Sequence, residues 1–421
     1  MKNRIDFKKL FFLTIVITLS LSFSSLKAQY LWNSDSAFRA GAPNSGRLWG
    51  YAFGDYSYKG HTDSLNRGGN NQYTGVPQTR SSFQFRRIYV GYDYNISKKF
   101  SAEFLLAAED DFAGGDLLVN NKFTPYIKYM NIRWKDFVFK GNDLVVGLSP
   151  TPAYPYLAES IWSYRSIERT VSDIRRTPSF DFGASLQGRF FNETKTASYG
   201  YNLMVGNGQS AKPENDIFKW FYGDAFVRFL NNKLIFDIYG DYERLNWTPA
   251  SPFTHHSRQM TKAYLAYATP ALTIGVEGFI NHSLNDVVGV AGARKDTLTA
   301  NSTGISVYVH GNIVKDKLRF FARFDSYNPD KDYDNGTYTK YIGLQATYEP
   351  NNKEQFITAG LDFIPVKNVH FMPNIWYNKY TGQGANLTGS AAKDHDLVYR
   401  LTFYFTFGKF FNNPSYSYNT P

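Results

Sequence analysis

Apolar and polar residues alternate along many segments of the chain, and this alternation constrains the fold more than any other feature. It is clearest near the C-terminus, where alternate positions are apolar: Leu397, Tyr399, Leu401, Phe403, Phe405 and Phe407. The positions between them include Arg400, Thr402 and Thr406. Because successive side chains of a β-strand point to opposite faces of the sheet, a period of two predicts strands with one apolar face.

The composition indicates that these apolar faces contact lipid. Aromatic residues make up 18% of the chain, yet its mean hydropathy is only −0.40. That value excludes a bundle of membrane helices, which needs repeated apolar segments of about 20 residues, whereas a barrel places its membrane band in every second residue. The chain has no Cys, so closure of the sheet rather than disulfides must stabilise it. We predict an all-β fold, a transmembrane antiparallel β-barrel in contact with the lipid bilayer.

The N-terminus has the features of an export signal. Basic residues within the first nine positions precede an apolar stretch, 10–23, and the small residue Ala28 follows. We expect cleavage before Gln29 and localisation in the outer membrane of a Gram-negative bacterium. The predicted organisation is a signal peptide over 1–28, one β-barrel over 29–411 and a short periplasmic tail over 412–421.

Sixteen segments have the length and alternation of barrel strands, and eighteen is the alternative number. The sixteen are 48–59, 83–96, 100–110, 125–135, 142–149, 179–191, 199–208, 218–230, 234–245, 259–269, 271–282, 301–314, 317–327, 354–366, 368–380 and 395–409. A further run, 338–349, is assigned to extra hairpin structure within a loop. We expect the segment 397–407 to close the sheet against the segment 48–59, which leaves no exposed edge in lipid.

Connections between these segments alternate in length, as in membrane-spanning barrels. The tight turns are 97–99, 231–233, 269–270, 315–317 and 366–368, and the long polar loops are 60–82, 111–124, 150–178, 246–258, 283–300, 328–353 and 381–394. The tight turns are expected to face the periplasm and the long loops the outside.

The loop 150–178 carries the clearest functional pattern. Its apolar residues Leu157, Ile161, Tyr164 and Val171 share one side of a predicted helix, and a neighbouring side carries the arginines Arg165, Arg169 and Arg176. A loop that folds into the barrel needs such a split, because it packs one side on the wall and turns the other to the channel. We predict a partly helical constriction loop in which these arginines and Glu168 filter anions. The alternative is an outward loop whose arginines pair with Glu159, Glu168 and Asp173.

The strand pattern also predicts charged residues on the lumen wall: Arg133, Arg189, Arg228, Arg319, Arg323, Arg400, Asp237 and Glu277. Opposing charges can set a transverse field across a diffusion pore, or they can form salt bridges that brace the wall, and the two roles are compatible. The formal charge of +10 is spread along the chain rather than clustered, so nucleic acid is not an expected partner.

Metal and catalytic patterns are weak. Asp330, Asp332 and Asp334 alternate as the ligands of a calcium loop do, although an Asn335-Gly336 turn with solvated carboxylates explains the run without a metal. No other cofactor is predicted. The motifs of nucleophilic hydrolases, zinc proteases and phosphate-binding loops are lacking, so we predict no enzymatic activity.

Several short motifs together resemble the outer-membrane porins of the phosphate-selective porin O/P family and related general porins of Gram-negative bacteria. They are the sequence FRRIYVG from Phe85, the run from Glu159 to Arg169 that leads to Asp181-Phe182-Gly183, the run from Ala359 to Asp362, and the final aromatic strand. The resemblance implies a sixteen-stranded, usually trimeric barrel that passes small anions or other solutes, with Arg165 and Arg169 at the pore. The chain differs from the family in two respects. It lacks a long ladder of wall arginines, and it continues beyond Phe411, whereas porins commonly end on an aromatic residue.

We therefore expect a passive porin for small hydrophilic solutes with a modest anion preference. A binding or assembly barrel, which recognises an extracellular or periplasmic partner, is the second hypothesis. A hydrolase assembled from distant Ser, His and acidic residues is the third.

Overall fold

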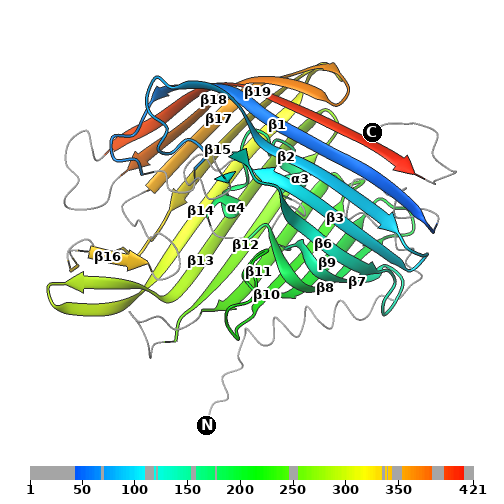
Figure 1. The fold of residues 1–421 in the computed structure, drawn as a ribbon, viewed down its shortest axis with the longest axis horizontal. Helices are drawn as coiled ribbons and strands as arrows, with labels where there is room; N and C mark the ends of the chain where they lie inside the picture. The colour runs from blue at the N-terminus through cyan, green and yellow to red at the C-terminus, as the bar shows by residue number, and fades with distance from the viewer. Residues whose placement is uncertain are drawn as a thin grey trace, which may run out of the picture.

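The wall of the molecule is a closed antiparallel β-barrel of sixteen strands (Figure 1). The structure is a computed structural model, and it describes residues 43–67, 71–109, 118–119, 122–152, 158–175, 178–245, 255–333, 337–338, 340–343, 353–381 and 393–411. The predicted signal peptide and tail lie outside these residues. No helix in the described ranges is long and apolar enough to cross a membrane.

The wall strands follow one another around the barrel in chain order. They are β1 (Ser45–His61), β2 (Ser81–Asn95), β3 (Phe100–Glu109), β6 (Tyr126–Trp134), β7 (Asn142–Pro150), β8 (Phe180–Phe191), β9 (Ser198–Gly206), β10 (Trp220–Phe229), β11 (Leu234–Arg244), β12 (Ser257–Ala268), β13 (Leu272–Ala291), β14 (Arg294–Val314), β15 (Leu318–Asn328), β17 (Lys353–Val366), β18 (Val369–Thr381) and β19 (Lys393–Phe411). Each predicted strand corresponds to one of these, which confirms the fold class and the number sixteen.

Closure of the barrel joins the first and last strands. β1 pairs with β2 on one side and with β19 on the other, in a register that runs from Gly46 opposite Phe411 to Tyr58 opposite Tyr399. This is the predicted pairing of 397–407 with 48–59. No wall strand therefore presents unpaired backbone groups to the surroundings along this seam.

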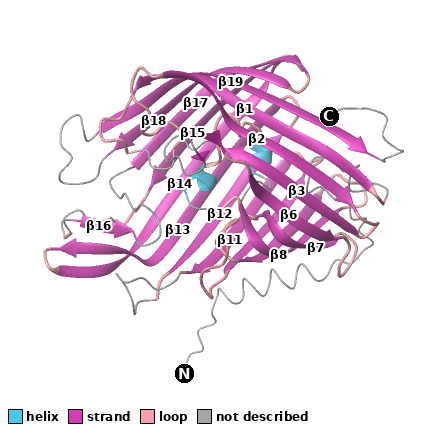
Figure 2. Cartoon of the chain, viewed as in Figure 1, coloured by secondary structure: helices cyan, strands magenta, loops and turns pink. Residues whose placement is uncertain are grey.

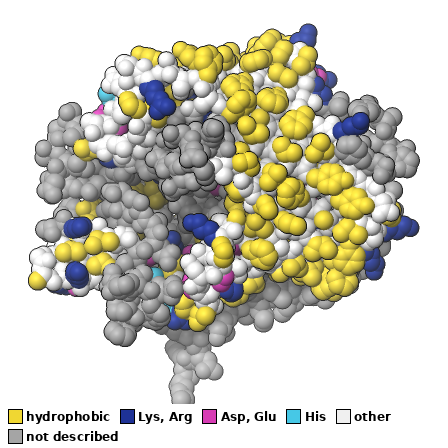
Figure 3. Space-filling model, viewed as in Figure 1, with side chains coloured by type: hydrophobic (Ala, Val, Ile, Leu, Met, Phe, Trp, Pro, Cys, Tyr) yellow, Lys and Arg dark blue, Asp and Glu magenta, His cyan; other side chains and the backbone are white. Residues whose placement is uncertain are grey.

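The two faces of the wall differ as the alternation predicts. Along β19, the outward residues Tyr399, Leu401 and Phe407 are exposed, whereas the inward residues Arg400 and Thr402 are buried. Apolar side chains cover the outer surface where Figure 1 labels β1, β2 and β3 (Figure 3). A water-soluble protein does not expose so large an apolar surface, so this face suits lipid.

The connections differ at the two ends of the barrel. Short turns join the strands at the end where β1 begins and β19 finishes, and they include 135–141 and 192–197, which the sequence did not suggest. Asn231 and Asn232 adopt positive φ angles of 59° and 60° in one such turn, which Asn tolerates. The longer connections lie at the opposite end, and 207–219 joins the predicted set.

The prediction of a long polar loop at 283–300 is wrong. β13 and β14 continue as a paired hairpin beyond the wall, with Val287 opposite Leu298 and Ala291 opposite Arg294. The short strand β16 (Lys340–Gly343) pairs with the same extension of β13, so the extra strand predicted at 338–349 lies outside the wall (Figure 1). The segment contains three valines among its polar residues, Val287, Val288 and Val290, and all three pair with both β14 and β16.

A small hairpin and two short helices also lie within the loops. β4 (Leu118–Val119) and β5 (Lys122–Phe123) form a small hairpin between β3 and β6. The helices α3 (Ala158–Trp162) and α4 (Val171–Arg175) belong to the connection between β7 and β8. Figure 2 shows both helices enclosed by the strands of the barrel.

Candidate functional site

The connection between β7 and β8 folds into the barrel and crosses its interior. Side chains from several wall strands bind its backbone or side chains, among them Arg86 of β2, His310 of β14, Arg323 of β15 and Trp376 of β18. His310 donates from Nε2 to the Ile161 carbonyl at 2.9 Å, and Trp376 donates from Nε1 to Glu168 Oε2 at 2.9 Å. The inward folding predicted for 150–178 is therefore present in the described part, 158–175.

The apolar side of this loop packs on the wall as predicted. Trp162 is fully buried, and its ring centroid lies 5.0 Å from that of Tyr308 on β14. Tyr164 packs against Phe321 of β15 at 4.6 Å. Val171 belongs to a second apolar cluster, which includes residues of β9 to β13. The loop is thus anchored on the half of the wall from β9 to β18; Leu157 lies outside the described residues.

The loop arginine Arg165 forms ion pairs within the loop. Its Nη1 lies 3.0 Å from Asp173 Oδ2 and 3.4 Å from Glu159 Oε1. Burial would raise the pKa of Asp173, but the charges of Arg165 and Arg169 outweigh it and hold that pKa below its ordinary value. Burial raises the pKa of Glu159, and Arg165 offsets only part of the effect. The pairing proposed in the outward-loop alternative therefore occurs within an inward loop.

The other predicted loop residues have different positions. Glu168 is buried and accepts hydrogen bonds from Trp376 and from the backbone of Arg169, so it holds the loop in place. Arg169 is half-buried and acts electrostatically on Asp173. Arg176 lies outside the described residues.

A group of charged residues, which we call the basic cluster, lies on the wall from β2 to β6. It comprises Arg87, Glu109 and Lys128, and Arg87 Nη1 and Lys128 Nζ lie 3.1 and 2.5 Å from the same oxygen of Glu109. Two cations thus share one carboxylate. Arg165 interacts electrostatically with both cations, so this wall faces the charged side of the loop. Half-buried tyrosines, among them Tyr51, surround the cluster.

The sequence showed only part of the basic cluster. Arg87 belongs to the FRRIYVG motif, but Lys128 and Glu109 lie on strands whose other inward residues are partly apolar and partly polar. Alternation alone could have placed both on the inner face.

The charged wall residues predicted from the strand pattern all lie on the inner face. Buried ones are Arg133, Arg189, Arg323, Arg400, Asp237 and Glu277, and half-buried ones are Arg228 and Arg319. Several form close pairs: Arg133 with Asp143 at 3.1 Å, Arg323 with Asp325 at 2.5 Å and Arg400 with Asn374 at 2.7 Å. These contacts support the bracing role.

A second connection, between β1 and β2, also reaches the interior. Tyr73 is buried and donates to Asp55 Oδ2 at 2.8 Å, and Asn71 donates to Glu354 Oε2 at 2.7 Å. Tyr73 also packs against Trp376. No sequence pattern indicated that part of 60–82 lies inside the barrel.

The predicted calcium loop is only partly described, since Asp334 lies outside the described residues. Asp330 accepts hydrogen bonds from the backbone of Asn301 and Asp332, and Asp332 accepts one from the Asn301 side chain. These bonds explain the acidic residues without a metal, and calcium binding stays a prediction.

Comparison with known proteins places the fold among porins. No model of a known protein family matches the chain, and no curated protein sequence matches it. Solved structures with a similar fold include an anion-selective porin from Comamonas acidovorans (TM-score 0.53, 11% identity, 86% of this chain and 100% of that chain). Others are OmpF of Salmonella typhi in complex with daunomycin (TM-score 0.52, 12% identity, 86% and 98%) and the outer membrane channel DcaP of Acinetobacter baumannii (TM-score 0.52, 11% identity, 86% and 98%). At these identities the likeness shows the fold alone.

Proposed function

We propose that the protein is an outer-membrane porin of a Gram-negative bacterium, through which small hydrophilic solutes diffuse passively. The observation that carries the proposal is the loop of α3 and α4, which crosses the interior of a sixteen-stranded barrel and packs on one half of its wall. A loop in this position narrows the lumen that the closed barrel surrounds. The porin titles of the similar solved structures support the same function.

The mechanism needs no cofactor. Solutes move down their gradient and are filtered by the bulk of the loop and by the field of charges beside it. The basic cluster and Arg165 favour anions modestly, because Arg87 and Lys128 share the single carboxylate of Glu109 and because Arg165 is nearer to solvent than the two carboxylates it pairs with. The side chains of Arg87 and Arg165 are 12% and 13% exposed, against 6% for Glu159 and 3% for Asp173.

Reversal potentials across a salt gradient in a planar bilayer test this preference. The wild type should pass chloride better than potassium, and Arg165→Ala and Arg169→Ala should lower the permeability ratio. Arg294→Ala is the matched control, because Arg294 lies on the projecting hairpin with a side chain 68% exposed. A cation preference that the loop substitutions leave unchanged contradicts anion selection, and absence of conductance contradicts the porin.

We also propose a homotrimer, as the resemblance implies. A trimer contact requires a flat apolar wall with small residues, and the outer face of β12 and β13 carries small residues such as Ala263 and Gly278. Three equal conductance steps in a single-channel record would support it, and single independent steps would contradict it.

A binding or assembly role is the second candidate, and the projecting hairpin of β13 and β14 favours it. The hairpin carries β16 on one edge and extends beyond the wall, where a partner can reach it. Deletion of 286–298 should abolish co-purification of a stoichiometric partner while conductance persists. Co-purification that survives the deletion contradicts a role for the hairpin.

A further inference from the structure

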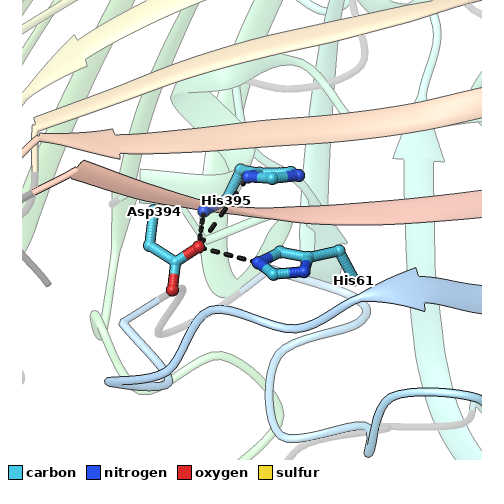
Figure 4. A group of neighbouring side chains, drawn as sticks. All are labelled: His61, Asp394 and His395. Atoms are coloured by element: carbon cyan, nitrogen blue, oxygen red, sulfur yellow. Dashed lines mark hydrogen bonds and ion pairs between the residues drawn. The ribbon is translucent and has the colours of Figure 1, made fainter. Parts of the chain in front are cut away.

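Three side chains of metal-binding type meet where the first and last strands reach the long-loop end of the barrel. His61 is the final residue of β1, and Asp394 and His395 lie at the start of β19 (Figure 4). His61 Nε2 lies 2.8 Å from Asp394 Oδ1, and His395 Nδ1 lies 3.7 Å from the same oxygen. One ligand atom from each residue lies within 4.8 Å of the others.

A local irregularity of the sheet brings these residues together. The register of β1 and β19 shifts between Lys59 and His61, so His61 stands opposite Leu397. Alternate residues of a regular strand point to opposite faces, and an irregularity of this kind re-aims a side chain. His61 thereby stacks on His395, with ring centroids 4.1 Å apart and planes 20° from parallel.

Two imidazoles and one carboxylate are a donor set for divalent transition metals such as Zn²⁺, Ni²⁺ and Cu²⁺. Ligands about 2.0–2.2 Å from an ion lie roughly 3–3.5 Å from one another, so the observed separations need only side-chain rotation. The side chains of His61, Asp394 and His395 are 36%, 17% and 34% exposed. An ion can therefore enter from solvent and keep water in its remaining positions.

Neighbouring groups already orient the carboxylate. The backbone N–H of Ser64 donates to Asp394 Oδ2 at 2.8 Å, and that of His395 donates to Oδ1 at 2.8 Å. Tyr377 packs on the ring of His395 with a centroid distance of 5.2 Å. Outer contacts of this kind hold ligands in position and raise metal affinity.

An ordinary ion pair explains the group less well. The other His–carboxylate pairs among the described residues, such as His370 with Asp362, use a single imidazole, whereas Asp394 faces two. Nearby carboxylates are already paired with cations: Asp396 lies 2.6 Å from Lys59. Within the described ranges, Asp394 forms ion pairs with His61 and His395 alone.

We propose that His61, Asp394 and His395 bind one divalent transition-metal ion, which links β1 to β19 at the long-loop end of the seam. The ion joins residues separated by 333 positions in the sequence. Its binding stabilises the closed barrel, because an ion held only by the folded chain shifts the unfolding equilibrium.

The test uses the full mature chain in detergent, without a polyhistidine tag. Isothermal titration with Zn²⁺ should show one ion per chain, and the EPR spectrum of the Cu²⁺-loaded protein should show coupling to two imidazole nitrogens. His61→Ala should remove one of these nitrogens and weaken Zn²⁺ binding at least about tenfold. The double variant with His395→Ala should weaken it at least about 100-fold, beyond the roughly 10- to 100-fold typical of a lost outer contact.

The control is His255→Ala, which removes an exposed histidine from another loop and should leave binding unchanged. Asp394→Asn separates charge from shape: it keeps the hydrogen-bond acceptor for Ser64 but should weaken Zn²⁺ binding. Far-UV circular dichroism verifies that each variant folds. Absence of stoichiometric binding by the wild type, or equal loss in the His255 variant, overturns the proposal. Binding is measured without conductance, so its outcome is independent of the porin function.

Discussion

Trp162 is the residue whose removal most directly tests how the loop is held inside the barrel. Its side chain is fully buried, and its Nε1 donates to the carbonyl of Glu168 at 3.0 Å. It packs against Tyr308 and Phe321 of the wall, and the guanidinium of Arg323 lies 5.4 Å from its ring centroid. Trp162→Ala removes these contacts while every wall strand keeps its pairing.

The substitution lowers the stability of the docked loop rather than the stability of the barrel wall. Replacing a buried Trp by Ala costs about 3–5 kcal/mol. At 1.4 kcal/mol per factor of ten, the docked-to-undocked ratio of the loop falls roughly 150- to 4,000-fold. Trp162→Phe keeps most of the apolar area and loses one hydrogen bond, so it should cost only about 1 kcal/mol.

Two measurements report on docking. Single-channel records of Trp162→Ala should show a larger mean conductance with added flicker, because the undocked loop obstructs the lumen less. Hydrogen exchange of the amides in 158–175 should quicken by the same factor, and this reading does not depend on channel function. Trp134→Ala is the matched control, since Trp134 is 38% exposed on the outer wall. Unchanged conductance together with unchanged exchange in Trp162→Ala would refute the anchoring role.

Three further predictions concern the wall and the loop carboxylates. Asp55→Ala leaves Arg86 as a buried cation without its carboxylate and should lower the free energy of unfolding by about 3–5 kcal/mol. The measurement is the urea midpoint of unfolding, and an unchanged midpoint contradicts the prediction. Gly183→Val should abolish barrel formation in refolding assays, because a Cβ there would lie 2.1 Å from a backbone oxygen of β9, and normal refolding would show that the strands can separate. Acidification should raise the anion preference measured by reversal potential, because Glu159 loses its negative charge before Asp173 does. Burial raises the pKa of Glu159, whereas the charges of Arg165 and Arg169 overcome burial and lower the pKa of Asp173. A falling preference contradicts that order.

The wall could be predicted from the sequence because each strand carries its own alternation. Leu397 to Phe407 shows both its faces within one segment, and closure against β1 then follows from the need to leave no edge in lipid. The hairpin beyond the wall was missed because polar residues such as Asn285, Asp286 and Lys295 interrupt the apolar–polar alternation, so the segment has the composition of a polar loop.

The inside of the barrel could be predicted only in part. The apolar side with Tyr164 and the basic side with Arg165 indicated that the loop turns inward. The wall residues that contact the loop, however, come from strands far along the chain. Nothing local pairs Trp162 with Tyr308, or His61 with His395. The position of such contacts depends on register and on one irregularity of the sheet, which alternation does not encode.

Pairing on the inner wall limits what its charges can do. Arg133 and Asp143, like Arg323 and Asp325, lie within about 3 Å of each other and are buried. The field of a close pair falls off faster with distance than that of a single charge, so these residues contribute little to selectivity at the loop. Their substitution should therefore change stability more than ion preference. An anion preference must come from cations that are not matched one to one by carboxylates, and in the basic cluster Arg87 and Lys128 share the single carboxylate of Glu109.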